Sequence, residues 1–235
     1  MNQFAVVESG EHEGSRFLCG GVMMLRVISF DLDGTLVTSR YVDRVWMEGV
    51  PEMYAQRYGL SLRAAKDIVI SQYNKIGTDR LEWYDLQYWL DRFDLKTSKR
   101  ELLDKYANDI ELFPEVPDVL ASLSKTYDLV ITSNAAREFI EMEIQVLGDC
   151  FIEVCSATSD FKNVKKSPAV FGWVCEKIGA YPSEVVHIGD HYAHDYEAAI
   201  KAGLYALYLD RKAHQSEQHI VTNLRDAEKR IQQLL

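Results

Sequence analysis

The sequence Val27-Ile28-Ser29-Phe30-Asp31-Leu32-Asp33-Gly34-Thr35 decides the fold prediction. Its first four residues form a short, largely apolar run, which is typical of a strand buried on both faces at the centre of a parallel sheet. Asp31 and Asp33 follow where that strand should end, and Gly34 can adopt backbone angles that other residues avoid. Because side chains alternate along a strand, the two carboxylates should lie on the same side. Carboxylates this close repel each other unless a cation lies between them or one of them holds a proton.

A simpler interpretation exists for the same residues. Asp33-Gly34 is also a strong signal for a tight turn with two solvated acids. Short motifs match by chance often enough that this stretch alone does not choose between the two interpretations. Three later segments, which end a predicted strand or open a predicted helix, favour the buried strand.

The composition of the 235 residues indicates a globular protein with room for one α/β domain and a smaller second domain. Lys and Arg number 26 against 36 Asp and Glu, which gives a formal net charge of −10. An acidic surface argues against nucleic acid or an anionic membrane as a partner, so a bound phosphate must meet a local cation. The four cysteines form no C-x-x-C pair, and no segment is long and apolar enough to span a membrane. We therefore expect a reduced, cytoplasmic protein, monomeric or homodimeric.

The order of the predicted elements divides the chain into a core and an inserted domain. Residues 1–24 show no sustained period, and we expect a poorly ordered N-terminal extension there. Residues 38–110 have helical patterns and no strand signal, which is too much chain for one crossover connection. We therefore predict a helical cap domain at 38–110, inserted into a core made of residues 25–37 and 111–235. The core alternates strands and helices, which predicts a Rossmann-like, doubly wound parallel sheet with helices on both faces.

Local signals place the individual elements. In the cap, Ser61 and Thr78 are the expected N-caps of two helices, and Ser98 with Glu101 forms a capping box for a third. The second of these helices should be continuous over residues 81–93. In the core we predict helices at 118–123, 136–147, 168–178 and 196–202, and strands at 128–132, 152–155, 184–188 and 205–209.

Polar residues suited to phosphate or metal chemistry lie at the ends of the later strands. Thr132-Ser133-Asn134 offers hydroxyl and amide groups at the start of a helix, although these groups could merely cap that helix. Lys165-Lys166 could supply a cation, although an exposed lysine pair is the simpler interpretation. Gly189-Asp190 ends another strand, and with Asp195 it offers two acids for a hard cation such as Mg²⁺. Because the carboxyl ends of parallel strands share one edge of the sheet, we expect these groups to lie together.

In this order the segments resemble the four motifs of the haloacid dehalogenase superfamily, in its phosphatase branch with an inserted helical cap of the C1 type. Asp31-Leu32-Asp33-Gly34-Thr35 is similar to the first motif, Ser133-Asn134 to the second, Lys165 in Lys-Lys-Ser-Pro to the third, and Gly189-Asp190 through Asp195 to the fourth. Each motif is weak alone, but four in the right order over residues 25–210 are specific. Thr132 remains an alternative to Ser133 as the hydroxyl of the second motif.

The resemblance implies a Mg²⁺-dependent phosphomonoester hydrolase that acts on a small phosphorylated metabolite. Asp31 would be the nucleophile that forms an aspartyl-phosphate. Asp33 would be the acid and the base, with its pKa raised by the neighbouring carboxylate. The resemblance also assigns a catalytic role to Lys165. It assigns phosphate binding to Thr35, Ser133, Asn134 and Lys165. The metal would be held by Asp31, the Asp33 backbone carbonyl and Asp190, with Asp195 either as a further ligand or as support for a water or Lys165.

The main alternative is a 2-haloacid dehalogenase, which cleaves a carbon–halogen bond by hydrolysis. A halide leaves without a proton, and those enzymes usually lack an acid at the position of Asp33. A phosphosugar mutase would need a base in the cap that we cannot identify, and a non-catalytic binding protein fits poorly with an intact set of acids. The sequence does not determine the substrate, because the choice of leaving group lies in the cap.

Three histidines near the fourth motif have structural explanations that we favour. His187 lies on a predicted buried strand, where a hydrogen-bonded core histidine is expected. His191 and His194 flank the acids of the motif, but a zinc site would need both on one face together with an acid. We interpret these two as loop residues.

Two features of the cap admit both a structural and a functional interpretation. The pairs Trp83-Tyr84 and Tyr88-Trp89 recur at helical spacing, which favours packing within the cap over a pocket for a substrate ring. Arg40 and Arg44 lie one helical turn apart near the first motif. For them we favour a solvated face over contact with a second anionic group of the substrate.

Overall fold

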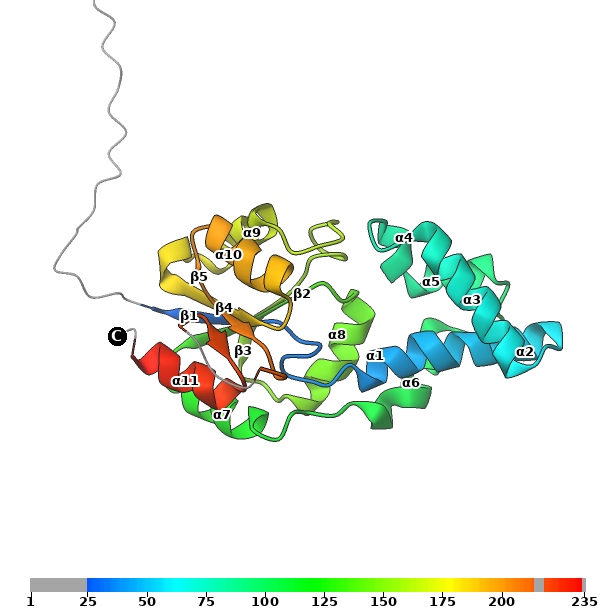
Figure 1. The fold of residues 1–235 in the computed structure, drawn as a ribbon, viewed down its shortest axis with the longest axis horizontal. Helices are drawn as coiled ribbons and strands as arrows, with labels where there is room; N and C mark the ends of the chain where they lie inside the picture. The colour runs from blue at the N-terminus through cyan, green and yellow to red at the C-terminus, as the bar shows by residue number, and fades with distance from the viewer. Residues whose placement is uncertain (1–24, 214–217, 234–235) are drawn as a thin grey trace, which may run out of the picture.

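The computed structural model describes residues 25–213 and 218–233 (Figure 1). The predicted extension at residues 1–24 lies outside the described residues. The described chain forms a parallel sheet flanked by helices, and a separate group of helices follows the first strand. The predicted α/β class with a Rossmann-like core and a helical insertion is confirmed. In the described residues, no helix combines the length and the apolar character that a membrane crossing needs.

Six strands of the described chain form one parallel sheet in the order β3-β2-β1-β4-β5-β6. Their bounds are β1 Val27–Phe30, β2 Asp128–Ser133, β3 Phe151–Ser156, β4 Val185–Gly189, β5 Tyr205–Leu209 and β6 Ile220–Val221. Strand β1 lies between β2 and β4, and all four of its residues are buried, as its apolar character predicts. Strand β6 is too short to be predicted from the sequence, because two residues are too few to show a period.

Helices cover both faces of the sheet (Figure 1). Their bounds are α7 Val116–Leu123, α8 Arg137–Glu143, α9 Pro168–Ile178, α10 Ala198–Lys201 and α11 Leu224–Gln232. Helices α7 and α11 pack with Ile28 and Phe30 of β1 in one apolar cluster. Helices α9 and α10 pack with Val27 in another, on the opposite face. Because β1 contributes to both clusters, the residues that follow it are held at the centre of the sheet edge.

Two of the predicted core helices are shorter than expected and continue as other turns. The predicted helix at 136–147 is α8 followed by a 3₁₀ turn at Ile144–Val146. The predicted helix at 196–202 is a π-helical turn at Tyr192–Glu197 followed by α10. Another 3₁₀ turn at Pro182–Glu184 precedes β4. A π turn is often found at functional sites, and this one carries Asp195.

The insertion between β1 and β2 is helical throughout. It contains α1 Arg40–Arg44, a π turn Val45–Gly49, α2 Val50–Tyr58, α3 Leu62–Ile76, α4 Leu81–Tyr84, α5 Leu86–Arg92, α6 Lys99–Tyr106 and a 3₁₀ turn Ala107–Asp109. We refer to these elements as the cap. The Ser61 cap and the capping box of Ser98 and Glu101 are confirmed.

One cap prediction is wrong. The expected helix over residues 81–93 is broken into α4 and α5 at Asp85, whose carboxylate accepts the N–H groups of Gln87 and Tyr88 at 2.9 and 3.2 Å. Arg80, not Thr78, precedes the first of these helices. A side chain that competes for backbone N–H groups starts a new helix, and apolar spacing does not reveal that competition.

The cap shares its apolar core with one helix of the sheet domain. Phe139 and Met142 of α8 lie in the same cluster as Trp46, Trp89 and Leu102 of the cap. The ring centroids of Trp46 and Phe139 are 5.6 Å apart with nearly parallel planes. Helix α8 therefore supports the cap directly above the carboxyl ends of the strands (Figure 1).

Candidate active site

The loop after β1 carries the first two carboxylates of the site. The Asp31 N–H donates to the Ile188 carbonyl of β4 at 2.9 Å, which fixes the start of the loop beside β4. Gly34 has a φ of 79°, in the left-handed region that favours glycine. A Cβ atom at Gly34 would lie 2.2 Å from Oδ2 of Asp190. Glycine therefore lets the acid at the end of β4 approach the loop.

A lysine reaches these carboxylates, but it is Lys166 rather than Lys165. The Lys166 Nζ lies 2.5 Å from Asp31 Oδ1 and also forms an ion pair with Asp195. Lys165 instead forms an ion pair with Asp79 of the cap. Neighbouring side chains of a non-helical segment point in different directions, so the sequence offered two lysines without distinguishing them. The structure therefore places Lys166, and not the predicted Lys165, beside the acids.

A chain of buried hydrogen bonds holds Lys166 in place. Asp195 Oδ1, which pairs with Lys166, lies 3.1 Å from His187 Nε2. His187 Nδ1 lies 2.9 Å from Ser29 Oγ, which lies 2.9 Å from Thr132 Oγ1. With its proton on Nε2, His187 donates to Asp195 and accepts from Ser29, and Ser29 accepts from Thr132, so each contact joins one donor to one acceptor. His187 is confirmed as a hydrogen-bonded core histidine, and the Thr132 hydroxyl is bound inside the sheet.

Burial and neighbouring charges set the pKa values of this cluster. Burial would lower the pKa of Lys166, but Asp195 and Asp31 outweigh it and raise that pKa above its ordinary value. Burial would raise the pKa of Asp195, yet Lys166 and His187 hold that pKa below its ordinary range. Burial raises the pKa of Asp31 more than Lys166 lowers it. Burial and Asp195 together raise the pKa of Asp190. The single positive charge of Lys166 therefore offsets only part of the negative charge of these carboxylates.

Three acids form a group whose donor chemistry fits a metal ion. One carboxylate oxygen each from Asp31, Asp190 and Asp195 lies within 4.8 Å of the other two. Both oxygens of Asp195 already have partners, since Oδ1 pairs with Lys166 and Oδ2 accepts the His191 N–H at 2.8 Å. Asp31 and Asp190 are therefore the carboxylates most available to a hard cation, which prefers oxygen ligands.

The hydroxyl and amide groups predicted to bind phosphate lie around the same strand ends. Ser133 Oγ accepts the Ala135 N–H at 3.1 Å, which leaves its own hydrogen available for donation. Asn134 Oδ1 accepts the Lys166 N–H at 2.7 Å and so fixes the lysine segment. Thr35 Oγ1 is buried and has no hydrogen-bond partner among the described residues. Of the two hydroxyls that the sequence left open, Ser133 is the one not committed to the sheet.

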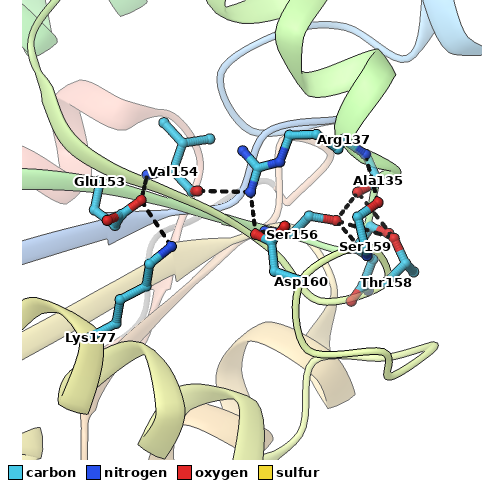
Figure 2. A network of polar contacts seen from close by, with 10 residues as sticks. Ala135, Arg137, Glu153, Val154, Ser156, Thr158, Ser159, Asp160 and Lys177 are labelled. Carbon is cyan, nitrogen blue, oxygen red and sulfur yellow. Dashed lines mark hydrogen bonds and ion pairs between the residues drawn. The ribbon is translucent and has the colours of Figure 1, made fainter.

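Side chains from β3 and the turn after it fix the loop that carries Asn134 (Figure 2). Ser156 Oγ donates to the Ala135 carbonyl at 2.7 Å, and Thr158 Oγ1 donates to the Asn134 carbonyl at 3.0 Å. The guanidinium of Arg137, the first residue of α8, donates a hydrogen bond to the Val154 carbonyl of β3 at 3.0 Å. None of these supports was predicted from the sequence, because each joins residues that are distant along the chain.

Glu143 at the end of α8 is an acid of this site that the sequence analysis missed. It is fully buried and interacts with Asp33. Burial and the nearby Asp33 raise the pKa of Glu143 well above its ordinary range. Neither carboxyl oxygen of Glu143 has a hydrogen-bond partner among the described residues. Burial raises the pKa of Asp33 to about 6, although the neighbouring Glu143 carboxyl opposes the rise. The sequence did contain a signal for Glu143. It lies four residues after Phe139 and three after Ile140, so it is an acid on the apolar face of its helix.

A cavity of about 200 Å³ opens beside Asp33, between α8 and the cap. Its lining includes Trp83 and Tyr84 of α4 and Phe139 of α8. Trp83 packs on Trp46 and Tyr84 within the cap, as expected, and both Trp83 and Tyr84 also line this cavity. The other pair, at residues 88–89, packs within the cap, as expected. The spacing of apolar residues locates the apolar face of a helix but does not show whether that face packs against other residues or lines a cavity.

The sequence profile of the haloacid dehalogenase-like hydrolases matches residues 25–203. The chain belongs to this family. The predicted superfamily and the prediction of a hydrolase are thereby confirmed. The match covers the loop after β1, the cap and the strand ends up to the helix after Asp195, so every part of the site described above lies inside it.

This hydrolase is similar to curated and solved proteins over most of its length. A phosphoglycolate phosphatase of Aliivibrio fischeri is 27% identical over 202 residues, which cover 79% of this chain and 84% of the relative. The structure of a HAD phosphatase from Thermococcus onnurineus superposes with a TM-score of 0.76 at 23% identity and covers 88% of this chain and 98% of that one. A 2-haloacid dehalogenase from Pseudomonas syringae superposes with a TM-score of 0.66 at 21% identity and covers 90% and 100%. These two structures show a shared fold.

Proposed function

We propose that this hydrolase releases phosphate from a small phosphomonoester through a covalent aspartyl-phosphate on Asp31. The observation that carries the proposal is the position of Asp31 at the sheet edge, 2.5 Å from the Lys166 ammonium, with Asp33 two residues later beside the cavity. The similarity to a phosphoglycolate phosphatase over four fifths of that relative supports the reaction class.

In the first step, an oxygen of Asp31 attacks phosphorus and the bond to the leaving oxygen breaks. Asp33 gives its proton to that oxygen, so the product leaves as a neutral alcohol. A pKa near 6 suits this role, because the acid form is populated close to neutral pH. Lys166 opposes the negative charge of the phosphoryl group and holds the nucleophile in position.

In the second step, water attacks the phosphorus of the aspartyl-phosphate, and the bond to the Asp31 oxygen breaks. Asp33, now a carboxylate, takes a proton from that water, so inorganic phosphate is released and both acids return to their starting states. Ser133 and Thr35 have free hydroxyl hydrogens for the phosphoryl oxygens.

Mg²⁺ is part of this proposal. Asp31 and Asp190 would hold it, with the Asp33 backbone carbonyl as a further ligand, while Asp195 supports Lys166. A bound cation supplies positive charge that stabilises the ionised nucleophile and the phosphoryl oxygens. The partly compensated acids of the cluster fit this role.

The presence of Asp33 favours a phosphatase over a dehalogenase. Carbon–halogen hydrolysis also uses a carboxylate nucleophile, but the leaving halide needs no proton. Asp33 has a raised pKa and a position beside the cavity, which are the properties of a proton donor.

The test is phosphate release from a panel of phosphomonoesters, with chloride release from 2-chloropropionate measured in parallel. We expect phosphate release that a chelator abolishes and added Mg²⁺ restores. Asp31→Asn, which keeps the shape of the side chain, should lower the rate by at least about 1,000-fold. Chloride release without added metal, and no phosphate release, would support the dehalogenase instead.

A further inference from the structure

The cavity beside Asp33 has room for one flat ring. Its volume is about 200 Å³, and an apolar cavity of about 150 Å³ already admits benzene. Three aromatic rings, of Trp46, Trp83 and Phe139, are part of its wall. The centroid of Trp46 is 5.6 Å from that of Phe139 and 6.3 Å from that of Trp83, with interplanar angles of 23° and 28°. A wall of stacked rings favours a planar apolar group packed against it.

The charges around the cavity disfavour a second anion. The described residues that line it include Asp33 and Asp43 but no Lys or Arg. A carboxylate or a second phosphate on the leaving group would therefore lose its water without gaining a cation. Asp43, which accepts the Ser39 hydroxyl at 2.8 Å, adds an acceptor for a donor group on the ligand.

The two arginines nearest in sequence are occupied elsewhere. Arg40 lies 3.0 Å from Asp109, and Arg44 lies 3.1 Å from Glu48 and 3.4 Å from Asp109. Both line a neighbouring surface depression, which shares Asp43 and Met47 with the cavity, and neither lines the cavity itself. The favoured interpretation of these arginines as a surface feature agrees with these contacts, and their side chains do not supply the cation that a second anionic group needs.

Position connects the cavity to the chemistry. Asp33 lines the cavity, and its Oδ1 is buried without a hydrogen-bond partner among the described residues. In the proposed function this carboxyl protonates the leaving oxygen, so the carbon skeleton of the leaving group must enter the space beside it. We propose that the cavity binds one uncharged aromatic ring, and that the substrate is an aryl or arylmethyl phosphate monoester. This inference rests on the proposed function.

The test compares benzyl phosphate with 2-phosphoglycolate and glycerol 2-phosphate in the presence of Mg²⁺. All three release an alcohol, so differences in kcat/KM report mainly how the leaving group binds. We expect benzyl phosphate to exceed both others by about tenfold or more, since stacking and burial of one ring contribute on this scale. A preference for 2-phosphoglycolate would overturn this inference alone. Release of phosphate from none of the three would overturn the proposed function, and this inference with it.

Three variants locate the effect. Trp83→Ala should lower kcat/KM for benzyl phosphate about tenfold and for 2-phosphoglycolate less than threefold. Met47 lines the cavity and is 39% exposed, so Met47→Lys introduces a cation that should reverse the preference toward 2-phosphoglycolate. Tyr88→Ala removes a cap ring outside the cavity and should change neither. An equal loss on both substrates in Trp83→Ala, with no change in preference in Met47→Lys, would contradict the assignment.

Discussion

The two sides of Asp33 are built from opposite kinds of side chain. Toward the sheet, Lys166 and its carboxylates are buried, and each depends on specific partners. Toward the cap, Trp46, Trp83 and Phe139 enclose an apolar cavity. A buried charge that loses its partner is costly, whereas apolar packing tolerates changes of similar volume. In the proposed function, the sheet side therefore fixes the reaction, and the cap side is free to select the leaving group.

The sharpest contrast should come from the two adjacent lysines. Lys166→Met removes the ammonium from Asp31 and Asp195, so we expect kcat to fall by about 100- to 1,000-fold. Lys165→Met is the matched control, because Lys165 contacts the cap and not the acids. Steady-state kinetics on one phosphomonoester checks both. Equal losses in the two variants would contradict the assignment of Lys166.

The next effect should come from the buried support of that lysine. His187→Leu removes one hydrogen-bond partner from Asp195 Oδ1 and one from the Ser29 hydroxyl, and we expect kcat to fall about 10- to 100-fold. The free energy of unfolding should fall by about 1–3 kcal/mol. In His187→Gln an amide can replace part of the hydrogen bonding, so part of the activity should return at similar stability. A variant His187→Leu with full activity would show that the chain of hydrogen bonds does not position the lysine.

Glu143 should affect pH dependence more than rate. The acid form of Asp33 acts in the first step, so kcat/KM falls as pH rises through its pKa. The neighbouring Glu143 carboxyl lowers that pKa. Glu143→Leu removes this polar group and should move the alkaline limb of the pH profile to higher pH. Glu143→Gln retains a polar group of similar shape and should leave the limb near its original position, whereas equal shifts in both would contradict this role of Glu143.

The smallest effect is expected where the cap meets the sheet domain at the surface. Asp79 pairs with Lys165, but the Asp79 side chain is 81% exposed. Pairs of this kind are weak and screened by salt. Asp79→Ala should therefore change KM by about twofold at most at low ionic strength and not measurably at high salt. A tenfold change would mean that this contact controls closure of the cap.

The sequence predicted the elements whose signals are local. The apolar run before Asp31 located the central strand, and the pair Ser98 and Glu101 located a helix start, because both signals involve neighbouring residues. The break in the helix at Asp85 was missed. The apolar pattern continues past Asp85, although the Asp85 side chain caps a new helix there. The four motifs located the sheet edge because each motif, like the signal for β1, consists of residues that are close together in the sequence.

The missing parts of the site depend on contacts between distant segments. Lys165 and Lys166 are equivalent in the sequence, and only the direction of each side chain separates them. Glu143 joins Asp33 across more than a hundred residues, so no spacing rule connects the two. Trp83 was recognised as apolar but not as a cavity wall, because a period shows which face is buried and not what covers it.

The most direct test of the account is to identify the residue that carries phosphate during turnover. The enzyme is mixed with a rapidly hydrolysed phosphomonoester and Mg²⁺, quenched in acid within milliseconds, and analysed by mass spectrometry of its peptides. Asp33→Asn should retain more of the covalent species, because the base for its hydrolysis is missing. We predict one phosphoryl group on Asp31, absent in Asp31→Asn. A label on another residue, or turnover that persists in Asp31→Asn, would contradict the central claim.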